Sequence, residues 1–238
     1  MDIAGLNNTR PINPSASHHE TWLKNLQGNI LSGHGRDHTV HLFLHLPSDV
    51  QDAKKVIAGL SRYVTSAWKQ EIERQQYRDY RIPGALFGTL HLSASGYLKI
   101  GISEDKLKDE FPEDEDTGKP RSNFVEGMAK HAHDDFGDPP QTNWDCGFKK
   151  AKIDAMLLLA DDDKDFLLRE ARGIMDALET QCDIVHVERG TALRNDDNEG
   201  IEHFGYVDGR SQPLFLSTDF QDLKKMAAKP IYGTRLNP

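Results

Sequence analysis

The sequence predicts an α+β fold: a ferredoxin-like (βαββαβ) antiparallel sheet with its helices on one face and a long insertion. The main observation is the order of patterns along the chain. It runs strand, helix, strand, insertion, strand, helix, strand, and so forms two βαβ-like halves. We expect residues 21–215 to form this domain, with the insertion at about 101–152. Residues 1–20 hold almost nothing to bury, so a mobile arm is expected there. Residues 216–238 are expected to be a C-terminal extension or a truncated link to a missing second half.

The first half begins with a strand. The segment TVHLFLHL (residues 39–46) alternates apolar residues with histidines, which predicts a strand with one wetter face. Ser48 followed by Gln51 is a capping-box pattern, and apolar residues recur at helical spacing after it. One helix is therefore expected from about residue 49 to 77. After an Ile-Pro-Gly break, residues 85–92 (ALFGTLHL) are expected to form the second strand.

The insertion carries weaker patterns. Residues 97–102 fit a short helical turn or a strand extension. The acidic run of residues 104–116 is typical of a solvated loop; calcium binding is the alternative, but the EF-hand spacing is absent. A second capping-box pattern opens a helix expected at 123–134, and Asp-Pro-Pro at 138–140 predicts a loop.

The second half repeats the first. Residues 153–160 (IDAMLLLA) are the most apolar segment and predict a buried central strand. Three aspartates at 161–163 place negative charge where the next helix begins, which the helix dipole favours. Residues 182–187 (CDIVHV) predict the last strand, which extends toward residue 193. The helix between these strands carries an apolar stripe of Leu167, Ala171, Ile174 and Leu178.

Composition excludes several classes of protein. The chain has 238 residues and a formal net charge of −9, and a nucleic-acid binder usually carries a basic face instead. The longest purely apolar run, residues 155–160, is far short of the roughly 20 residues of a membrane helix. Two cysteines cannot make a disulfide scaffold or a four-cysteine zinc site. No basic n-region precedes an apolar stretch at the N-terminus, so a cytoplasmic location is expected.

The segment that could carry chemistry is IEHFGYVDGRSQPLF, residues 201–215. Gly205 and Gly209 bracket Asp208, and two glycines so close allow a tight backbone path and the close approach of a flat ligand. A carboxylate held there can act as a general acid or base. The alternative is an ordinary Asp-Gly turn, because these residues are a common turn pair.

Three segments carry a family resemblance. GYVDG fits the GxxDG motif of the dye-decolorising (DyP-type) haem peroxidases, and the following Arg210–Pro213 is similar to that family as well. Residues 25–36 (NLQGNILSGHGR) resemble the family's opening signature, and residues 124–144 give a weaker likeness. The three segments occur in the family's order. The family's fold, one half of a dimeric α+β barrel, agrees with the predicted sheet.

The resemblance implies a haem b enzyme that reduces hydrogen peroxide and oxidises aromatic donors in one-electron steps. Asp208, on the distal face, would take a proton from one peroxide oxygen and return it to the other. A carboxylate suits this role in acid, because an aspartate stays ionised where a histidine is already protonated. The backbone close to the porphyrin would be that of Val207, Gly209, Arg210, Ser211 and Gln212.

The resemblance extends to the N-terminal half of such an enzyme. Family members take the proximal histidine that ligates the iron, and a distal arginine, from a second half. Here no histidine follows His203, so the iron ligand is unknown. The alternative hypothesis is a non-catalytic or incomplete half, a haem-binding or subunit-interaction module. Such a module would need a partner chain that carries the axial histidine. A homo-oligomer and a complementing C-terminal half are the partners considered. An interaction domain without cofactor is a third hypothesis.

Other polar residues are weaker candidates. His131, His133, Asp134 and Asp135 could bind a metal, but histidines two residues apart do not share a helix face, so solvated residues are expected. The remaining histidines of interest are expected to be surface or packing residues, with substitute haem ligation as the alternative; they are His41, His45, His91, His186 and His203. Cys146 and Cys182 are expected to be buried, inert thiols.

Overall fold

The computed structural model describes residues 11–109, 123–149, 152–207 and 214–220. The chain divides into two compact units, each assembled from separate stretches. The larger unit takes its residues from 36–64 and 85–192, and the smaller unit from 1–35, 65–84 and 193–238. The domain limits expected at residues 21 and 215 stay a prediction.

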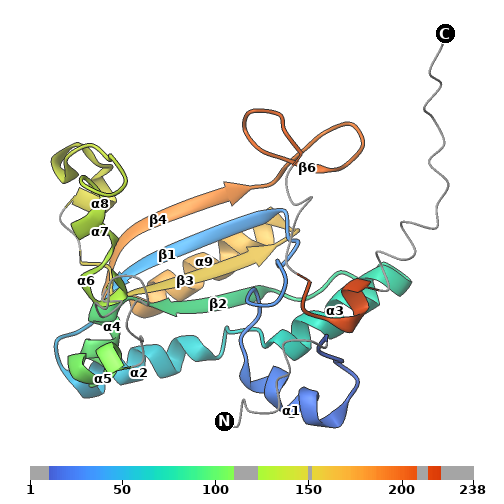
Figure 1. Cartoon of the computed structure of the whole chain (residues 1–238), viewed down its shortest axis with the longest axis horizontal. Coiled ribbons are helices and arrows are strands. Elements are labelled where there is room, and N and C mark those ends of the chain that lie inside the picture. The colour runs from blue at the N-terminus through green and yellow to red at the C-terminus, as the bar shows by residue number, and fades with distance from the viewer. Residues whose placement is uncertain (1–10, 110–122, 150–151, 208–213, 221–238) are drawn as a thin grey trace, which may run out of the picture. The chain divides into compact units, whose positions relative to one another are not determined.

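The larger unit is built on a four-stranded antiparallel sheet in the order β2-β3-β1-β4 (Figure 1). The strands are β1 (His38–His45), β2 (Phe87–Leu92), β3 (Ala155–Asp161) and β4 (Asp183–Thr191). The connection from β1 to β2 skips over β3 and contains α2 (Val50–Ser61), while that from β3 to β4 skips over β1 and contains α9 (Lys164–Leu178). This split βαβ arrangement confirms the ferredoxin-like fold predicted from the sequence.

One face of the sheet carries the main core. Along β1 the burial alternates, with Val40, Leu42 and Leu44 turned toward α2 and α9. The central strand β3 is buried on both faces, as its continuous apolar run predicts. The apolar stripe predicted for α9 is confirmed, since its four residues are all buried in this core. Burial of two amphipathic helices on one face therefore leaves His41, Phe43 and the other alternate residues on the opposite face.

The prediction of a single helix over residues 49–77 is wrong. The structure has two helices there, α2 and α3 (Ala67–Tyr80). Ser66 caps α3 by accepting the N–H of Lys69, and the preceding turn includes Thr65, whose carbonyl accepts the N–H of Gly28. The apolar spacing runs through this break in phase, so periodicity could not reveal it. The capping residue of α2 is also Asp49, which accepts two N–H groups, rather than Ser48.

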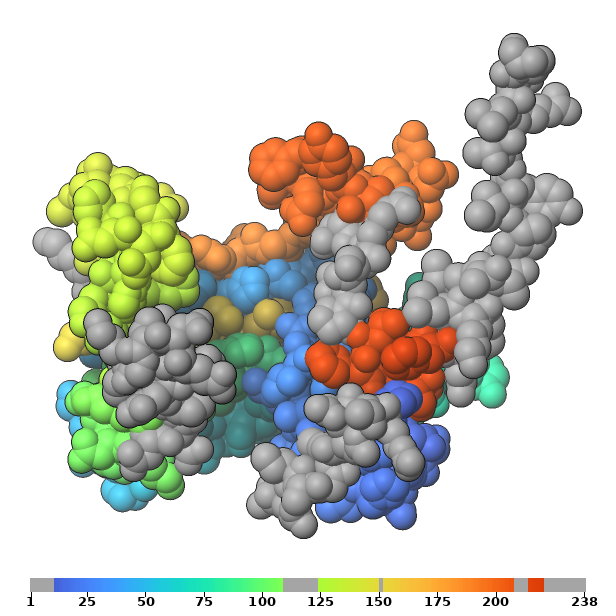
Figure 2. All heavy atoms as spheres, viewed as in Figure 1, coloured from blue at the N-terminus to red at the C-terminus, as the bar shows by residue number. Residues whose placement is uncertain are grey.

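The insertion between β2 and β3 is more helical than expected. Residues 94–99 and the start of the acidic run form helices, and Gly127, at φ +78°, divides the helix expected at 123–134. In Figure 2 the described residues from 124 to 149 form a lobe, coloured yellow-green, beside one end of the sheet. Before the lobe come α4 (Ala94–Lys99) and α5 (Glu104–Asp109). The lobe region contains α6 (Asn123–Glu126), α7 (Met128–His131), the 3₁₀ turn η1 (Gln141–Asn143) and α8 (Cys146–Lys149).

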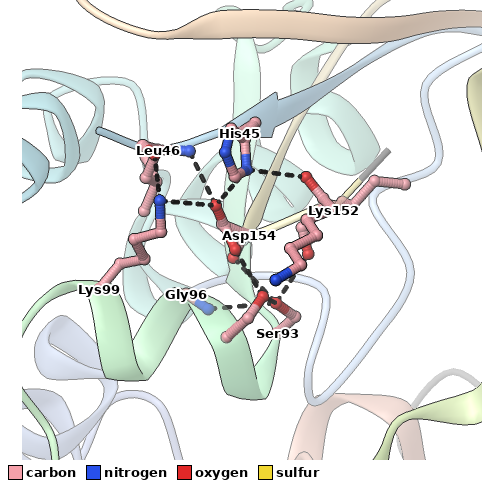
Figure 3. Close-up of polar contacts among 9 residues, drawn as sticks. His45, Leu46, Ser93, Gly96, Lys99, Lys152 and Asp154 are labelled. Atoms are coloured by element: carbon pink, nitrogen blue, oxygen red, sulfur yellow. Dashed lines mark hydrogen bonds and ion pairs between the residues drawn. The ribbon is translucent and has the colours of Figure 1, made fainter. Parts of the chain in front are cut away.

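A buried carboxylate joins the sheet to the insertion (Figure 3). Asp154 is fully buried just before β3, and its side chain accepts the backbone N–H of Leu46 at 2.9 Å and the hydroxyl of Ser95. The Nδ1 atom of His45 lies 2.8 Å from the same carboxylate. The Lys99 ammonium lies 3.9 Å away and donates to the Leu46 carbonyl at 2.7 Å. Asp154 thus connects the end of β1, the start of β3 and helix α4.

The smaller unit contains α1 (Ser17–Asn25), α3 and a short hairpin of β5 (Leu193–Arg194) and β6 (Gly200–Ile201). Leu23 of α1 is fully buried, and the ammonium of Lys24 lies 4.6 Å from the Trp68 ring centroid on α3. Helix α1 begins inside the segment 1–20 that was expected to be an arm; residues 1–10 lie outside the described part. None of the described helices combines the length and hydropathy needed to cross a membrane.

We predict opposite effects for two glycine-to-alanine substitutions. At Gly96 of α4 a methyl group would overlap the backbone carbonyl of Asp154, so Gly96→Ala should lower the free energy of unfolding by about 1–3 kcal/mol. Gly59, inside α2, has open space around it, and Gly59→Ala should raise that free energy by about 0.5–1 kcal/mol. Urea unfolding measures both variants. Effects of the same sign would contradict this packing.

Stability should also fall in mild acid because of two histidines on the sheet. Desolvation lowers the pKa of His41, with Glu188 opposing this and His91 adding to it, and desolvation lowers the pKa of His91. A lowered folded-state pKa means that the unfolded chain binds the proton more readily. Their contribution to stability is therefore present above the ordinary histidine pKa of about 6.5 and lost as pH falls through the folded-state values.

Chemical unfolding at pH 7.5, 6.5 and 5.5 tests this. The double variant His41→Gln/His91→Gln should lose less stability over that range than the wild-type chain does. An unchanged slope in the double variant would show that other groups cause the acid sensitivity.

Candidate functional site

The segment that leads to Asp208 makes a tight hairpin. Gly205 has φ +86°, its N–H donates to the Glu202 carbonyl, and the Glu202 N–H donates to the Tyr206 carbonyl at 2.8 Å. Val207 then forms an antiparallel bridge with Ile201 of β6. Glycine is required at this turn because a positive φ is strained for residues with a side chain.

Most of the predicted site residues lie outside the described residues. These are Asp208, Gly209, Arg210, Ser211 and Gln212, while Val207 is the last described residue before them. Their proposed roles stay predictions. The structure does describe the chain on both sides, from Ile201 to Val207 and from Leu214 to Phe220.

The segment after the motif is fixed by backbone pairing with the N-terminal stretch. Ile12 donates its N–H to the Phe215 carbonyl at 2.8 Å and accepts the Ser217 N–H at 2.8 Å, which makes a parallel bridge to Leu216. The Asp219 carboxylate accepts the N–H of Leu216 at 2.9 Å. Both a main-chain partner and a local side-chain bond therefore hold residues 215–217.

The opening signature, residues 25–36, folds back onto the start of α3. Leu26 accepts the N–H of Ala67, Gly28 donates to the Thr65 carbonyl, and Gln27 bridges Ser66. These bonds anchor the residues that come before Asn29.

The structure brings these two segments together at one cavity. The cavity is about 660 Å³, which lies within the usual range of about 300–1,000 Å³ for small-molecule and cofactor sites. It is lined by Asn29, Ile30, Leu31, Ser32 and Gly33 from the opening signature, and by Leu214, Phe215 and Asp219 from the segment after the motif. The opening signature and the stretch that directly follows the GxxDG segment thus meet in the smaller unit. The weaker likeness, residues 124–144, belongs to the larger unit.

Two residues of α3 that the sequence analysis missed hold these segments. The Gln70 side chain bonds to the backbone of Asn29, Ser32 and Gly33. The Arg74 side chain bonds to Thr218 and Asp219. In sequence both look like the solvated face of a long helix, and no local signal distinguishes them.

The other candidates do not form a metal site in the described part of the chain, where no group of three His, Cys, Asp or Glu side chains could hold an ion. His131 lies between two carboxylates, with Nδ1 2.6 Å from Asp135 and Nε2 3.0 Å from Glu126. Because its two nitrogens point to different partners, these groups do not converge on one point. His133 is hydrogen-bonded to the Asp138 carbonyl instead.

The sheet histidines are used in packing and hydrogen bonds. His186 of β4 makes an edge-on ring contact with Phe148 of α8, with centroids 5.0 Å apart. His91 lies 3.0 Å from the Thr89 hydroxyl, and His45 is bonded to Asp154. These contacts agree with packing histidines, and haem ligation by them stays an untested alternative.

One expectation about the cysteines is wrong. Cys146 is exposed, because it lies at the start of α8 on the lobe rather than in the core. Cys182 is partly buried, and its burial, together with the charge of Asp183, raises the pKa of its thiol to about 11. Cys182 is therefore protonated and unreactive at neutral pH, as expected for an inert thiol.

Comparison with known proteins finds relatives that all belong to one family, the DyP-type peroxidases. Residues 25–194 match the family described as the DyP dimeric alpha+beta barrel domain. The chain is 36% identical over 200 residues to the multifunctional dye peroxidase DyP2 of Amycolatopsis sp., covering 84% of this chain and 39% of that protein. It is 27% identical over 191 residues to a dye-decolorizing peroxidase of Mycetinis scorodonius, covering 80% of this chain and 33% of the relative.

A solved structure agrees. The crystal structure of a DyP-type peroxidase from Anabaena sp. superposes with a TM-score of 0.77 at 38% identity, covering 89% of this chain and 44% of that one. The chain therefore spans less than half the length of the relatives it matches.

Proposed function

Because this chain belongs to the DyP-type peroxidase family, we propose that it takes part in the reduction of hydrogen peroxide with Asp208 as the acid/base group. The observation that carries this proposal is the cavity of the smaller unit. The opening signature lines one side of it, and the stretch that lines the other side begins six residues after Asp208, just beyond the GxxDG segment. The established activity of the relatives is that of dye-decolorizing peroxidases.

Asp208 has the chemistry for proton transfer at peroxide. An ordinary aspartate pKa of about 3.9 leaves the carboxylate ionised in mild acid, where a histidine is already protonated. The carboxylate takes a proton from one peroxide oxygen and returns it to the other, which becomes the leaving water. Positioned acid/base groups of this kind contribute about 10²–10⁴-fold to rates.

Haem, when bound, supplies the redox chemistry that splits peroxide and then takes single electrons from aromatic donors. The residues Ile30, Leu31, Leu214 and Phe215 give the cavity apolar walls. Among the described residues, its lining contains no His, Cys, Met or Tyr that could ligate iron, so these residues do not complete a haem site. We propose that Val207 and Gly209–Gln212 contact the porphyrin and that the axial histidine comes from outside this sequence.

That missing ligand favours a second candidate function. The chain spans 39% of the length of the Amycolatopsis relative, and no histidine follows His203 in its sequence. The alternative is an incomplete half, a haem-binding or subunit-interaction module. It becomes competent only when a partner chain, such as a complementing C-terminal half, supplies the histidine.

A haemin titration separates these functions. We expect the chain to give a saturable Soret change with haemin, strengthened by added imidazole, which replaces the missing axial ligand. Peroxide is then added with an aromatic donor, and turnover is followed. A Soret change without turnover, both with and without imidazole, would identify a binding module. No Soret change with or without imidazole would identify an interaction domain without cofactor.

The role of Asp208 is tested in the haemin-loaded chain. Asp208→Asn should lower peroxide turnover by about 10²–10⁴-fold because the proton acceptor is lost, while the affinity for haemin stays the same. The matched control is Asp196→Asn, an exposed aspartate in the loop between β5 and β6 that should not change turnover. Full activity in Asp208→Asn would overturn the assigned role.

A further inference from the structure

The larger unit has a groove of its own, of about 820 Å³, between α9 and β4. Among the described strands, β4 has only β1 as a neighbour, so it forms one edge of the sheet (Figure 1). The groove lies wholly within residues 36–64 and 85–192, and it shares no lining residue with the cavity of the smaller unit. Its volume is within the usual range of about 300–1,000 Å³ for small-molecule sites.

The floor of the α9–β4 groove is apolar. Val40 and Ala171 belong to the main core and are 2% and 3% exposed. Leu168, Met175 and Val187 are only partly buried and pack against that core. Covering such side chains further is favourable, by about 25 cal/mol for each Å² of apolar surface removed from water. The floor therefore suits the apolar body of a ligand.

Three arginines line the same groove, Arg169 and Arg172 from α9 and Arg189 from β4. None of the three has a hydrogen bond or an ion pair with another described residue. The cross-strand partner of Arg189 on β1 is Val40, so Arg189 lies on the face of the sheet that the helices cover. An arginine on that face without an acceptor in the described chain is well placed to receive the acid group of a ligand.

Gly173, in the middle of α9, keeps the helix side of the groove open. Glycine inside a helix is less stable than alanine, so it usually has a packing or conformational reason. Here neither applies, because a Cβ atom at this position would meet nothing within 4 Å. Since Gly173 lines the groove, a long side chain there would extend into it. The glycine thus fits a site in which a ligand lies close to the helix.

The charges around the groove favour one kind of anion. Asp165 and Asp176 also line it, so three arginines face two aspartates and leave a formal excess of one positive charge. A monoanion neutralises this excess, whereas a polyanion would also be repelled by the two carboxylates. The planar fork of arginine matches a carboxylate through two parallel hydrogen bonds. Together with the apolar floor, this selects an organic monocarboxylate.

We propose that the α9–β4 groove binds an organic monocarboxylate, with its acid group on the arginines and its apolar body on the floor. The proposal does not depend on Asp208 or on haem, because the groove contains no residue of the peroxide-site segments. Charged residues on an edge strand can also serve to prevent the addition of another strand. That role accounts for Arg189, but it does not account for the two arginines of α9 or for Gly173.

The test uses the full chain without added haemin and decanoate as the probe, with binding followed by titration calorimetry. Decanol has a similar apolar body without the charge, and acetate has the carboxylate without the body. We expect decanoate to bind saturably and at least about 10-fold more tightly than either of these, because both parts of the groove contribute.

Variants of the lining test which residues bind the probe. Arg172→Gln and Arg189→Gln should each weaken decanoate binding about 10-fold, because each removes a charged donor to the carboxylate. Gly173→Leu should weaken binding by filling the groove, while its stability in urea stays the same or rises, because leucine is a better helix former. Lys164→Gln is the matched control: it removes the same charge from an exposed α9 residue outside the lining and should bind like the wild-type chain.

Methionine methyl signals in NMR spectra locate the bound probe without any measure of activity. The signal of Met175, on the floor of the groove, should shift as decanoate is added. Met128 is 74% exposed on the lobe and reports adsorption elsewhere, so its signal should stay in place.

Three results would overturn the proposal. Decanoate that binds the arginine variants as tightly as the wild-type chain would show that the arginines do not receive the acid group. Decanol that binds as tightly as decanoate would show that only apolar contact matters. If decanoate does not bind but an acidic peptide does, with new hydrogen-exchange protection of β4 amides, the occupant is an added strand rather than a small carboxylate.

Discussion

The buried carboxylate of Asp154 is the interaction on which the larger unit depends. Two strands that are neighbours in the sheet, β1 and β3, meet at this residue, and its side chain takes up the Leu46 N–H that would otherwise be buried without a partner. The Lys99 ammonium balances its charge, Nδ1 of His45 lies 2.8 Å from the carboxylate, and Ser95 brings in α4. Such a group is costly to bury alone, so these partners must be assembled together with the sheet.

The smaller unit uses the same principle for a different purpose. Irregular segments cannot bury their backbone unless side chains satisfy it, and α3 provides those side chains on one face. Gln70 binds the loop of the opening signature, and Arg74 binds Thr218, in the stretch that follows the GxxDG motif. Segments almost 190 residues apart in sequence therefore share one cavity, whose shape depends on a helix that carries no part of either motif.

Periodicity predicted the sheet well because burial follows it directly. Burial alternates along β1, as its alternating sequence predicts. The continuous apolar run of β3 is buried on both faces, and the apolar stripe of α9 is buried in the core. Periodicity failed where a break kept the helical phase, between α2 and α3, and where Gly127 turned the chain within an apparently helical segment. Both breaks are set by backbone hydrogen bonds or by a positive φ, neither of which alters the spacing of apolar residues.

The sequence by itself determined the sheet with its helix-covered face, and the motifs that identify the family. These follow from residue type and spacing, which act locally and repeat along the chain. Only the tertiary structure decided that residues 29–33 and 214–219 line one cavity, and that Gln70 and Arg74 hold them. The reason is physical: a polar side chain on a helix has the same local pattern whether water or a distant backbone receives its hydrogen bonds.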